Sequence, residues 1–153
     1  MKRVKDIAFF KHIREIREYQ FGKFYFFDGL VIGELNEGIT FGWEMGKKAI
    51  DAAKDVFGED MPIAYISNRI NNYYVLPADW SKFYKNRHQL SFYCVVGETN
   101  GSFASLVMER MFFKNSIKQF NDLEKAIEWS LVQIKKHQAK KGINSGSLSS
   151  NVE

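Results

Sequence analysis

The sequence has little of several features that would narrow its function at once. Its 153 residues include one cysteine, Cys94, which excludes an internal disulfide framework and a zinc site built from several cysteines. No stretch approaches the roughly 20 apolar residues of a membrane-spanning helix. The segment 38–42 has two glycines but neither a Walker lysine nor a three-glycine dinucleotide pattern, so we expect its glycines to serve turns.

The sequence also lacks a large excess of one sign of charge, since its net charge is only +4. The basic excess lies near the two chain ends, in residues 1–23 and 114–141, rather than on one predicted element. We therefore expect no nucleic-acid partner. Lys11, His12 and Arg14 interrupt the apolar start that a secretory signal would need, and together with the free cysteine this predicts a cytoplasmic protein.

What the chain does have is apolar and aromatic side chains, at 45% and 16% of residues, which is enough for one folded domain. We place that domain at residues 12–137, after an N-terminal extension at 1–11. Residues 138–153 are predicted to form a flexible polar tail, because Ser, Gly and Asn dominate its last part.

The first half of the domain is typical of an antiparallel β-meander. Aromatic and β-branched residues flank Asp28-Gly29, a pair that favours a tight hairpin turn. Residues 13–37 are accordingly predicted to be extended, although a short helix over residues 6–18 is a live alternative. A helical pattern then begins after Thr40, its predicted cap, and ends at Gly58.

Strands and helices alternate from that point to the end of the domain. We predict strands at 62–66, 90–96 and 117–120, and helices beginning at Pro77, at Ser102 and at Asn121, where Glu124 completes a capping-box pattern. Such alternation implies parallel crossovers. The predicted fold is a single α/β domain: a β-meander, then an αβαβαβα order, with a mixed sheet of five or six strands packed by helices.

This order and four stretches of sequence resemble STAS-like proteins, small bacterial proteins related to the sporulation anti-sigma factor antagonist and to CRAL-TRIO lipid-binding folds. The matching stretches are Phe21-Gly22-Lys23-Phe24-Tyr25, Glu34 to Gly38 leading into Trp43-Glu44, Ser67 to Tyr73, and Phe112-Phe113. The resemblance implies a non-enzymatic switch that binds a partner protein. In the antagonists, a serine in the loop after the central strand is phosphorylated; here only Ser67 could take that role, and the glycine of that loop is missing.

The best candidate site is the polar loop that follows the predicted strand 62–66. Its residues leave the carboxyl end of an inner strand, where open α/β sheets place their ligands. We expect the recognition residues to be Ser67, Asn68, Arg69, Asn72 and Tyr73. Alternatively, Arg69 pairs with Glu37 or Glu44 and braces the loop.

Other residues with reactive side chains favour structural roles. Cys94 lies in an apolar run and is expected to be a core residue, and Glu44 falls in a first helical turn, where a carboxylate is stabilised without any function. Glu34 is interpreted as the polar alternate of a half-buried strand. His12, His88 and His137 are far apart in sequence, so we expect surface histidines, no metal site and no cofactor.

The sequence thus predicts a non-enzymatic, STAS-like protein-interaction module, with a regulatory role as one option. The alternative is a carrier of a small apolar or lipid-like ligand, which the aromatic content also favours. A homodimer is left open.

Overall fold

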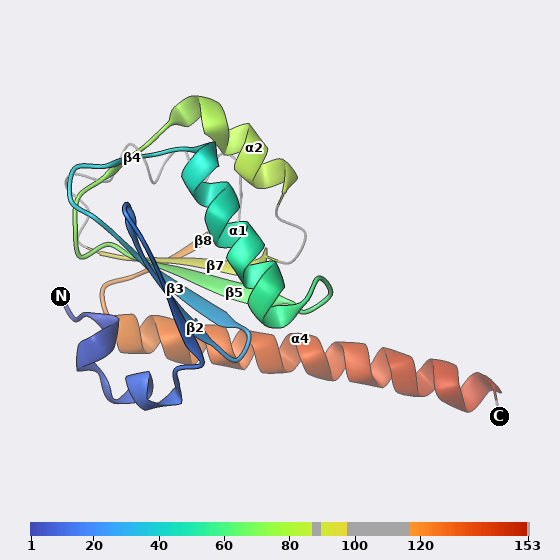
Figure 1. Cartoon of the computed structure of the whole chain (residues 1–153). Helices are drawn as coiled ribbons and strands as arrows, with labels where there is room; N and C mark the ends of the chain where they lie inside the picture. Colours follow the sequence, from blue (N-terminus) through green and yellow to red (C-terminus); the bar gives the residue numbers. More distant parts are fainter. Residues whose placement is uncertain (87–89, 98–116, 153) are drawn as a thin grey trace.

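A computed structural model describes residues 1–86, 90–97 and 117–152, and it has a mixed sheet with helices on both faces (Figure 1). The six strands lie in the order β1-β2-β3-β5-β7-β8. The first three pair antiparallel, and β3, β5, β7 and β8 pair parallel. Their bounds are β1 Glu15–Tyr19, β2 Gly22–Phe27, β3 Leu30–Leu35, β5 Ile63–Asn68, β7 Leu90–Val96 and β8 Ile117–Phe120. The predicted α/β fold with a mixed sheet is confirmed.

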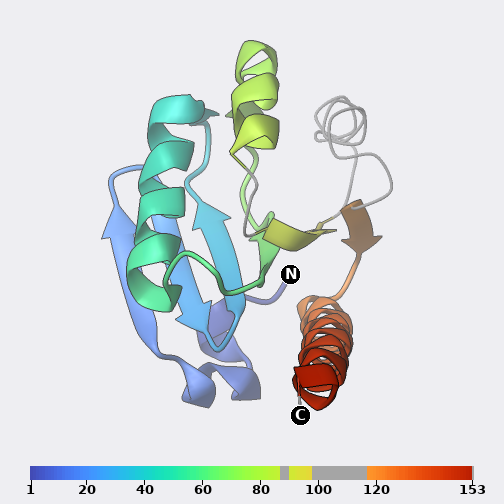
Figure 2. The same cartoon turned by 90° about the vertical axis from the view of Figure 1, so that its right-hand side faces the viewer.

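Among the described residues, two helices cover one face of the sheet and a third covers the other. Helices α1 (Trp43–Phe57) and α2 (Trp80–Lys85) stand side by side on the first face (Figures 1 and 2). A 3-10 turn, η3 (Pro77–Asp79), leads into α2, as the proline predicts. The opposite face carries α4 (Leu123–Val152). The helix predicted from Ser102 lies outside the described residues.

The N-terminal half follows the predicted meander. Phe27 and Leu30 close the β2–β3 hairpin, and Gly29 takes a φ of 71°, which glycine adopts without strain. Residues 6–18 combine both alternatives, since a 3-10 helix, η2 (Ala8–His12), precedes β1.

The N-terminal extension packs against the sheet. Val4, in the 3-10 turn η1 (Val4–Asp6), is fully buried, and Ile7 joins the same core. The Phe9 ring lies 4.7 Å from that of Phe27. Residues 1–11 therefore contribute to the hydrophobic core on the α4 face.

Both predicted N-terminal helix caps are wrong by one or two positions. Thr40 lies in a short strand, β4 (Thr40–Phe41), and α1 begins after Gly42, where the Trp43 N–H donates to Asp79 at 2.7 Å. A carboxylate from a later segment thus replaces the local cap. At α4 the Glu124 N–H donates to Asp122, not to Asn121. Gly58 ends α1 as predicted.

The last helix is longer than its apolar stripe. The sequence predicts a flexible tail from residue 138, but α4 continues to Val152 and its end projects beyond the sheet (Figure 1). Once a helix is nucleated, each further residue adds a backbone hydrogen bond, so a packed first half can extend into a polar segment. The flexibility of this segment stays a prediction.

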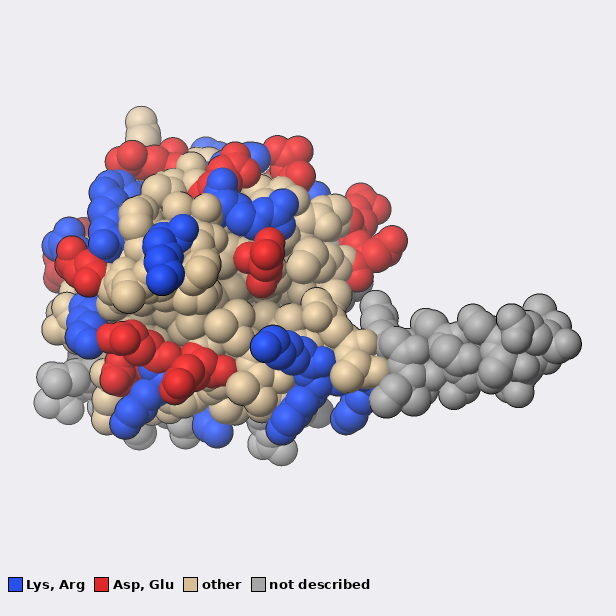
Figure 3. Space-filling model, turned by 90° about the horizontal axis from the view of Figure 1, so that it is seen from below, with Lys and Arg blue, Asp and Glu red and all other residues tan. Residues whose placement is uncertain are grey.

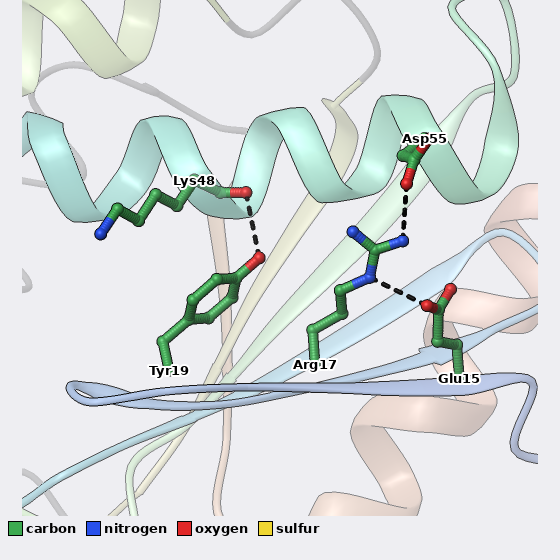
Figure 4. A network of polar contacts seen from close by, with 5 residues as sticks. All are labelled: Glu15, Arg17, Tyr19, Lys48 and Asp55. Atoms are coloured by element: carbon green, nitrogen blue, oxygen red, sulfur yellow. Dashed lines mark hydrogen bonds and ion pairs between the residues drawn. The ribbon is translucent and has the colours of Figure 1, made fainter.

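The outer strand β1 is tied to α1 by polar contacts (Figure 4). Arg17 donates to Asp55 of the helix at 2.7 Å and to Glu15 of its own strand at 2.9 Å. The hydrogen bonds to Asp55 and Glu15 raise the pKa of the Arg17 guanidinium. The Tyr19 hydroxyl reaches the Lys48 carbonyl. These contacts fix the helix over the antiparallel half of the sheet.

Candidate functional site

The predicted site residues lie at the carboxyl end of β5, an inner strand between β3 and β7. Ser67 and Asn68 belong to the strand itself, and both are 1% exposed. Arg69 follows at 7% exposed, Tyr73 is half-buried and Asn72 is exposed. Because side chains alternate along a strand, Ser67 and Asn68 face opposite sides of the sheet and belong to two different clusters.

Asn68 faces the α4 side and forms a cluster with Glu34. The Asn68 amide donates to Glu34 Oε2 at 2.7 Å and to the Lys2 carbonyl at 3.1 Å. The same Glu34 oxygen accepts the Val4 N–H at 2.9 Å. Burial, and then the negative charge of Glu34, raises the pKa of Tyr25 to about 12. This cluster attaches the N-terminal segment to the sheet.

The position of Glu34 corrects its interpretation as the polar alternate of a half-buried strand. β3 is buried at every residue, because helices or the N-terminal segment cover both faces. Glu34 is 8% exposed and binds buried donors. Its role in the structure is to satisfy polar groups inside the core.

Ser67 faces the α1 side and forms a second cluster with Arg69 and Tyr73. The hydroxyl oxygens of Ser67 and Tyr73 are 2.7 Å apart, and Arg69 Nε donates to Ser67 Oγ at 3.3 Å. The guanidinium carbon lies 5.0 Å from the centre of the Tyr73 ring. A hydrogen bond and a cation–π contact therefore orient the arginine.

The remainder of the loop is hydrogen-bonded to the end of β3 and to the chain that follows it. The Asn71 amide donates to the Leu35 carbonyl at 2.9 Å, and the Asn72 N–H donates to Glu37 at 2.7 Å. Glu37, one of the two expected partners of Arg69, thus holds the loop through Asn72; Glu44 is exposed on α1. A short strand, β6 (Tyr74–Val75), pairs with β4 to complete the attachment.

An apolar cavity of about 160 Å³ lies between the sheet and helices α1 and α2, and the second cluster forms part of its wall. The wall is built mainly from aliphatic and aromatic side chains of six strands, β2 to β7, and of helices α1 and α2. Its described residues are Phe24, Val31, Leu35, Phe41, Gly46, Ala49, Ile50, Ala53, Lys54, Ile63, Tyr65, Arg69, Tyr73, Val75, Phe83, Asn86, Leu90 and Tyr93.

The cavity has a cause in the sequence of α1. Ala49 and Ala53 present small side chains at positions where larger residues would fill the space. At Gly46 the helix is approached by Phe83: a Cβ there would lie 2.1 Å from the ring. On the sheet side, a Cβ added to Gly33 would lie 2.3 Å from the Tyr65 hydroxyl oxygen, so only glycine leaves room for that ring. Small residues thus let aromatic rings form the wall.

The remaining reactive residues have structural settings. Cys94 is fully buried, as predicted, with Sγ 3.5 Å from Ser130 Oγ, and burial raises the pKa of its thiol to about 11. His12 is exposed and His137 packs near Phe92, whereas His88 lies outside the described residues. Within the described residues, no three His, Cys, Asp or Glu side chains lie close enough together to hold a metal ion.

The face seen from below in Figure 3 carries Lys and Arg beside Asp and Glu rather than one sign alone. Lys2 and Glu124 form an ion pair between the N-terminal segment and α4. In the parts of the chain that the structure describes, no helix combines the length and the apolar character needed to cross a membrane.

Comparisons of the chain with protein-family models, with curated proteins and with solved structures find no match. The site therefore has to be interpreted from its own geometry. The sequence predicts polar site residues at the end of β5. It does not predict the cavity, the burial of Glu34 or the contacts of the N-terminal segment. The available signal for the cavity was the small residues on the apolar face of α1, opposite strands rich in aromatic residues.

Proposed function

We propose that this protein binds a small, mainly apolar molecule reversibly in the cavity between α1, α2 and the sheet. The observation that carries the proposal is the cavity itself, about 160 Å³ with mainly apolar walls that include Arg69 and Tyr73. An apolar cavity of about 150 Å³ is known to hold a molecule the size of benzene. The occupant is accordingly about the size of one aromatic ring with a short substituent, which is smaller than a membrane lipid.

The position of the cavity supports the same proposal. Ligands of open α/β sheets bind at the carboxyl ends of parallel strands, and the polar cluster of Ser67, Arg69 and Tyr73 lies at that end of β5. Apolar walls with a few fixed polar groups are typical of small-molecule sites. The proposal assigns binding only, with no covalent step.

Ligand-observed NMR with benzamide as a neutral probe tests this function. Wild-type protein should bind benzamide at millimolar or lower concentration, the range expected of a molecule of this size. Ala49→Leu and Ala53→Leu place a larger side chain into the cavity, and each should weaken binding about tenfold or more. Asp51→Leu is the matched control, since it adds the same side chain at an exposed position of the same helix.

Two results would contradict the proposal. One is the absence of benzamide binding to wild-type protein, together with no retained small molecule in native mass spectra of mildly purified protein. The other is equal binding by the Ala49→Leu variant, the Asp51→Leu control and the wild type.

A second candidate is the protein-interaction module that the resemblance implies, and an exposed pair of side chains supports it. Tyr74 is 56% exposed and Leu76 is 39% exposed, with Val75 buried between them. Tyr74 lies in β6 and Leu76 directly follows this strand, so the two side chains lie on one side of the chain. A STAS-like relationship, with a partner protein bound here, is likewise a proposal, supported by the mixed sheet and the order of its elements.

Tyr74→Ser with Leu76→Ser tests this second candidate. The double variant should keep its melting temperature and lose co-purification of any partner that wild-type protein retains, whereas Ile16→Ser, at another exposed apolar position, should keep it. A second copy of the chain would appear as a mass in light scattering that rises with concentration. Equal co-purification by both variants would contradict a role for this pair.

A further inference from the structure

We propose that the ligand of the cavity is a compact organic carboxylate, with its apolar body between α1 and the sheet and its carboxylate bound by Arg69. This inference rests on the proposed small-molecule function and specifies the chemical class of the ligand. It assigns Arg69 as the residue that selects charge.

The first argument is the charge of the wall. Among the described residues that line the cavity, the charged ones are Arg69 and Lys54, both cationic, with no Asp or Glu. In an environment of low dielectric constant, an anion is attracted to such a wall and a cation is repelled. The electrostatics therefore favour an acidic ligand over an amine of equal size.

The second argument is the way Arg69 is held. The residue is 7% exposed, its backbone N–H donates to the Val96 carbonyl at 2.9 Å, and its Nε donates to Ser67 Oγ. The ring of Tyr73 lies under the guanidinium, and the Tyr73 hydroxyl is bonded to the same Ser67. An arginine oriented before binding loses little side-chain freedom when a ligand arrives, which strengthens the interaction.

The third argument concerns the kind of anion. A guanidinium presents a planar set of donors that matches the two oxygens of a carboxylate. Lys54, by contrast, is exposed in the last turn of α1, so Arg69 is the buried cation of the described wall. One guanidinium can bind both oxygens of one carboxylate group, which carries a single negative charge. A phosphate monoester would bring more charge, and more bound water to remove, than this wall compensates.

Four probes with one aromatic ring and different charge test the inference: benzoate, benzamide, benzylamine and phenylphosphonate. Dissociation constants are measured by ligand-observed NMR on the full chain. Wild-type protein should bind benzoate about tenfold or more tightly than benzamide, as hydrogen bonds to a charged group allow, and benzylamine least. Tighter binding of phenylphosphonate than of benzoate would overturn the choice of a carboxylate.

Substitution of Arg69 then locates the selectivity. Arg69→Gln should bind benzoate and benzamide within about twofold of each other, because only the charged interaction is lost. Arg69→Lys keeps the charge without the planar donors and should show an intermediate preference. Lys47→Gln, which removes an exposed charge of α1 outside the cavity wall, should keep the wild-type preference.

The outcomes separate this inference from the proposed function. If benzamide binds and benzoate binds no better, the cavity takes a small molecule and the carboxylate assignment is wrong. If no probe binds, the proposed function fails as well. A preference for benzoate that survives in Arg69→Gln and Arg69→Lys would show that another group selects the charge. The wild-type comparison decides the class of ligand even if an Arg69 variant fails to fold.

Discussion

The two sides of β5 are packed to different degrees. On the α4 side, Asn68 and Glu34 lie against the N-terminal segment, and the core there includes Leu123, Ile127 and Ile134 of α4. On the α1 side, Ser67 accepts a hydrogen bond from Arg69, which lines a cavity of about 160 Å³. The polar residues are adjacent in sequence, yet one cluster fastens a segment of the chain and the other lines empty space.

The difference comes from the helices and not from the strands. Every strand residue of β3 is buried, so the sheet offers apolar surface on both sides. Helix α4 covers that surface with branched aliphatic residues, whereas α1 places the small side chains of Ala49 and Ala53 opposite it. A binding site needs unfilled space beside oriented polar groups, whereas a protein core is close-packed.

Truncation of matched leucines should show this difference most strongly. Leu30 and Leu35 lie at the two ends of β3; Leu30 is in the α4-side core and Leu35 lines the cavity. We expect Leu30→Ala to lower the free energy of unfolding by about 4 kcal/mol and Leu35→Ala by about 2 kcal/mol, because Leu35 already borders space and loses fewer contacts. Urea unfolding measures both. Equal losses would show that the cavity is closed in solution.

Removal of the buried carboxylate tests the fastening role of the α4-side cluster. Glu34→Ala removes the carboxylate that accepts hydrogen bonds from the Asn68 amide and the Val4 N–H, and it should cost about 3 kcal/mol. Glu34→Gln keeps an oxygen acceptor and should cost about 1 kcal/mol. Chemical denaturation gives the difference. If the two variants are equally stable, the hydrogen bonds of Glu34 do not hold the N-terminal segment.

Much of the fold could be predicted because local signals agree with it. Asp28-Gly29 between aromatic runs predicts the β2–β3 hairpin, and the apolar run at residues 90–96 coincides with β7. The caps of α1 and α4 could not be placed so well. Asp79 caps α1 from 36 residues further along the chain, and no local pattern reports such a contact.

The candidate site shows the same limit. The position of Arg69 after an inner strand could be predicted, but its burial could not, because this depends on Tyr73 and on segments that fold over it. The sequence predicts that the loop presents Ser67 and Asn68 to a partner. Both are buried, and a kinase could reach Ser67 only if this end of the strand opened. The cavity results from how the side chains pack in three dimensions, and the spacing of apolar residues in the sequence does not predict it.

A third experiment probes Gly33, which lies beside Tyr65 and Phe24, two residues of the cavity wall. A Cβ there would lie 2.3 Å from the Tyr65 hydroxyl oxygen and 3.1 Å from the Phe24 ring. Gly33→Ala should therefore lower the free energy of unfolding by about 2 kcal/mol, as overpacking does. In a Tyr65→Phe background the closest atom is gone, and the cost should fall to about half. A double-mutant cycle from urea unfolding measures the coupling. Strictly additive effects would place the Tyr65 ring away from Gly33.

Alkaline pH should lower the free energy of unfolding through two buried groups on the α4 side of the sheet, Cys94 and Tyr25. The loss from each group should be smaller than the losses caused by the substitutions above. Burial raises the pKa of Cys94 from 9.0 to about 11, and burial together with Glu34 raises that of Tyr25 from 10.0 to about 12. The folded protein keeps these protons at pH values where the unfolded chain has released them. Stability should then be constant below about pH 8.5 and fall above pH 9, by up to about 1.4 kcal/mol per pH unit for each group.

Cys94→Ala separates the two contributions to this alkaline loss. Without the thiol, the decline should begin nearer pH 10, where the Tyr25 hydroxyl of the unfolded chain starts to ionise. Urea midpoints measured at half-unit steps of pH follow the shift, and each variant is compared with its own value near neutral pH, so that any packing defect cancels. An unchanged onset would mean that Cys94 ionises as readily in the folded protein as in the unfolded chain. That result would contradict the burial of its thiol between β7 and α4, and with it the closed packing that distinguishes this face from the cavity side.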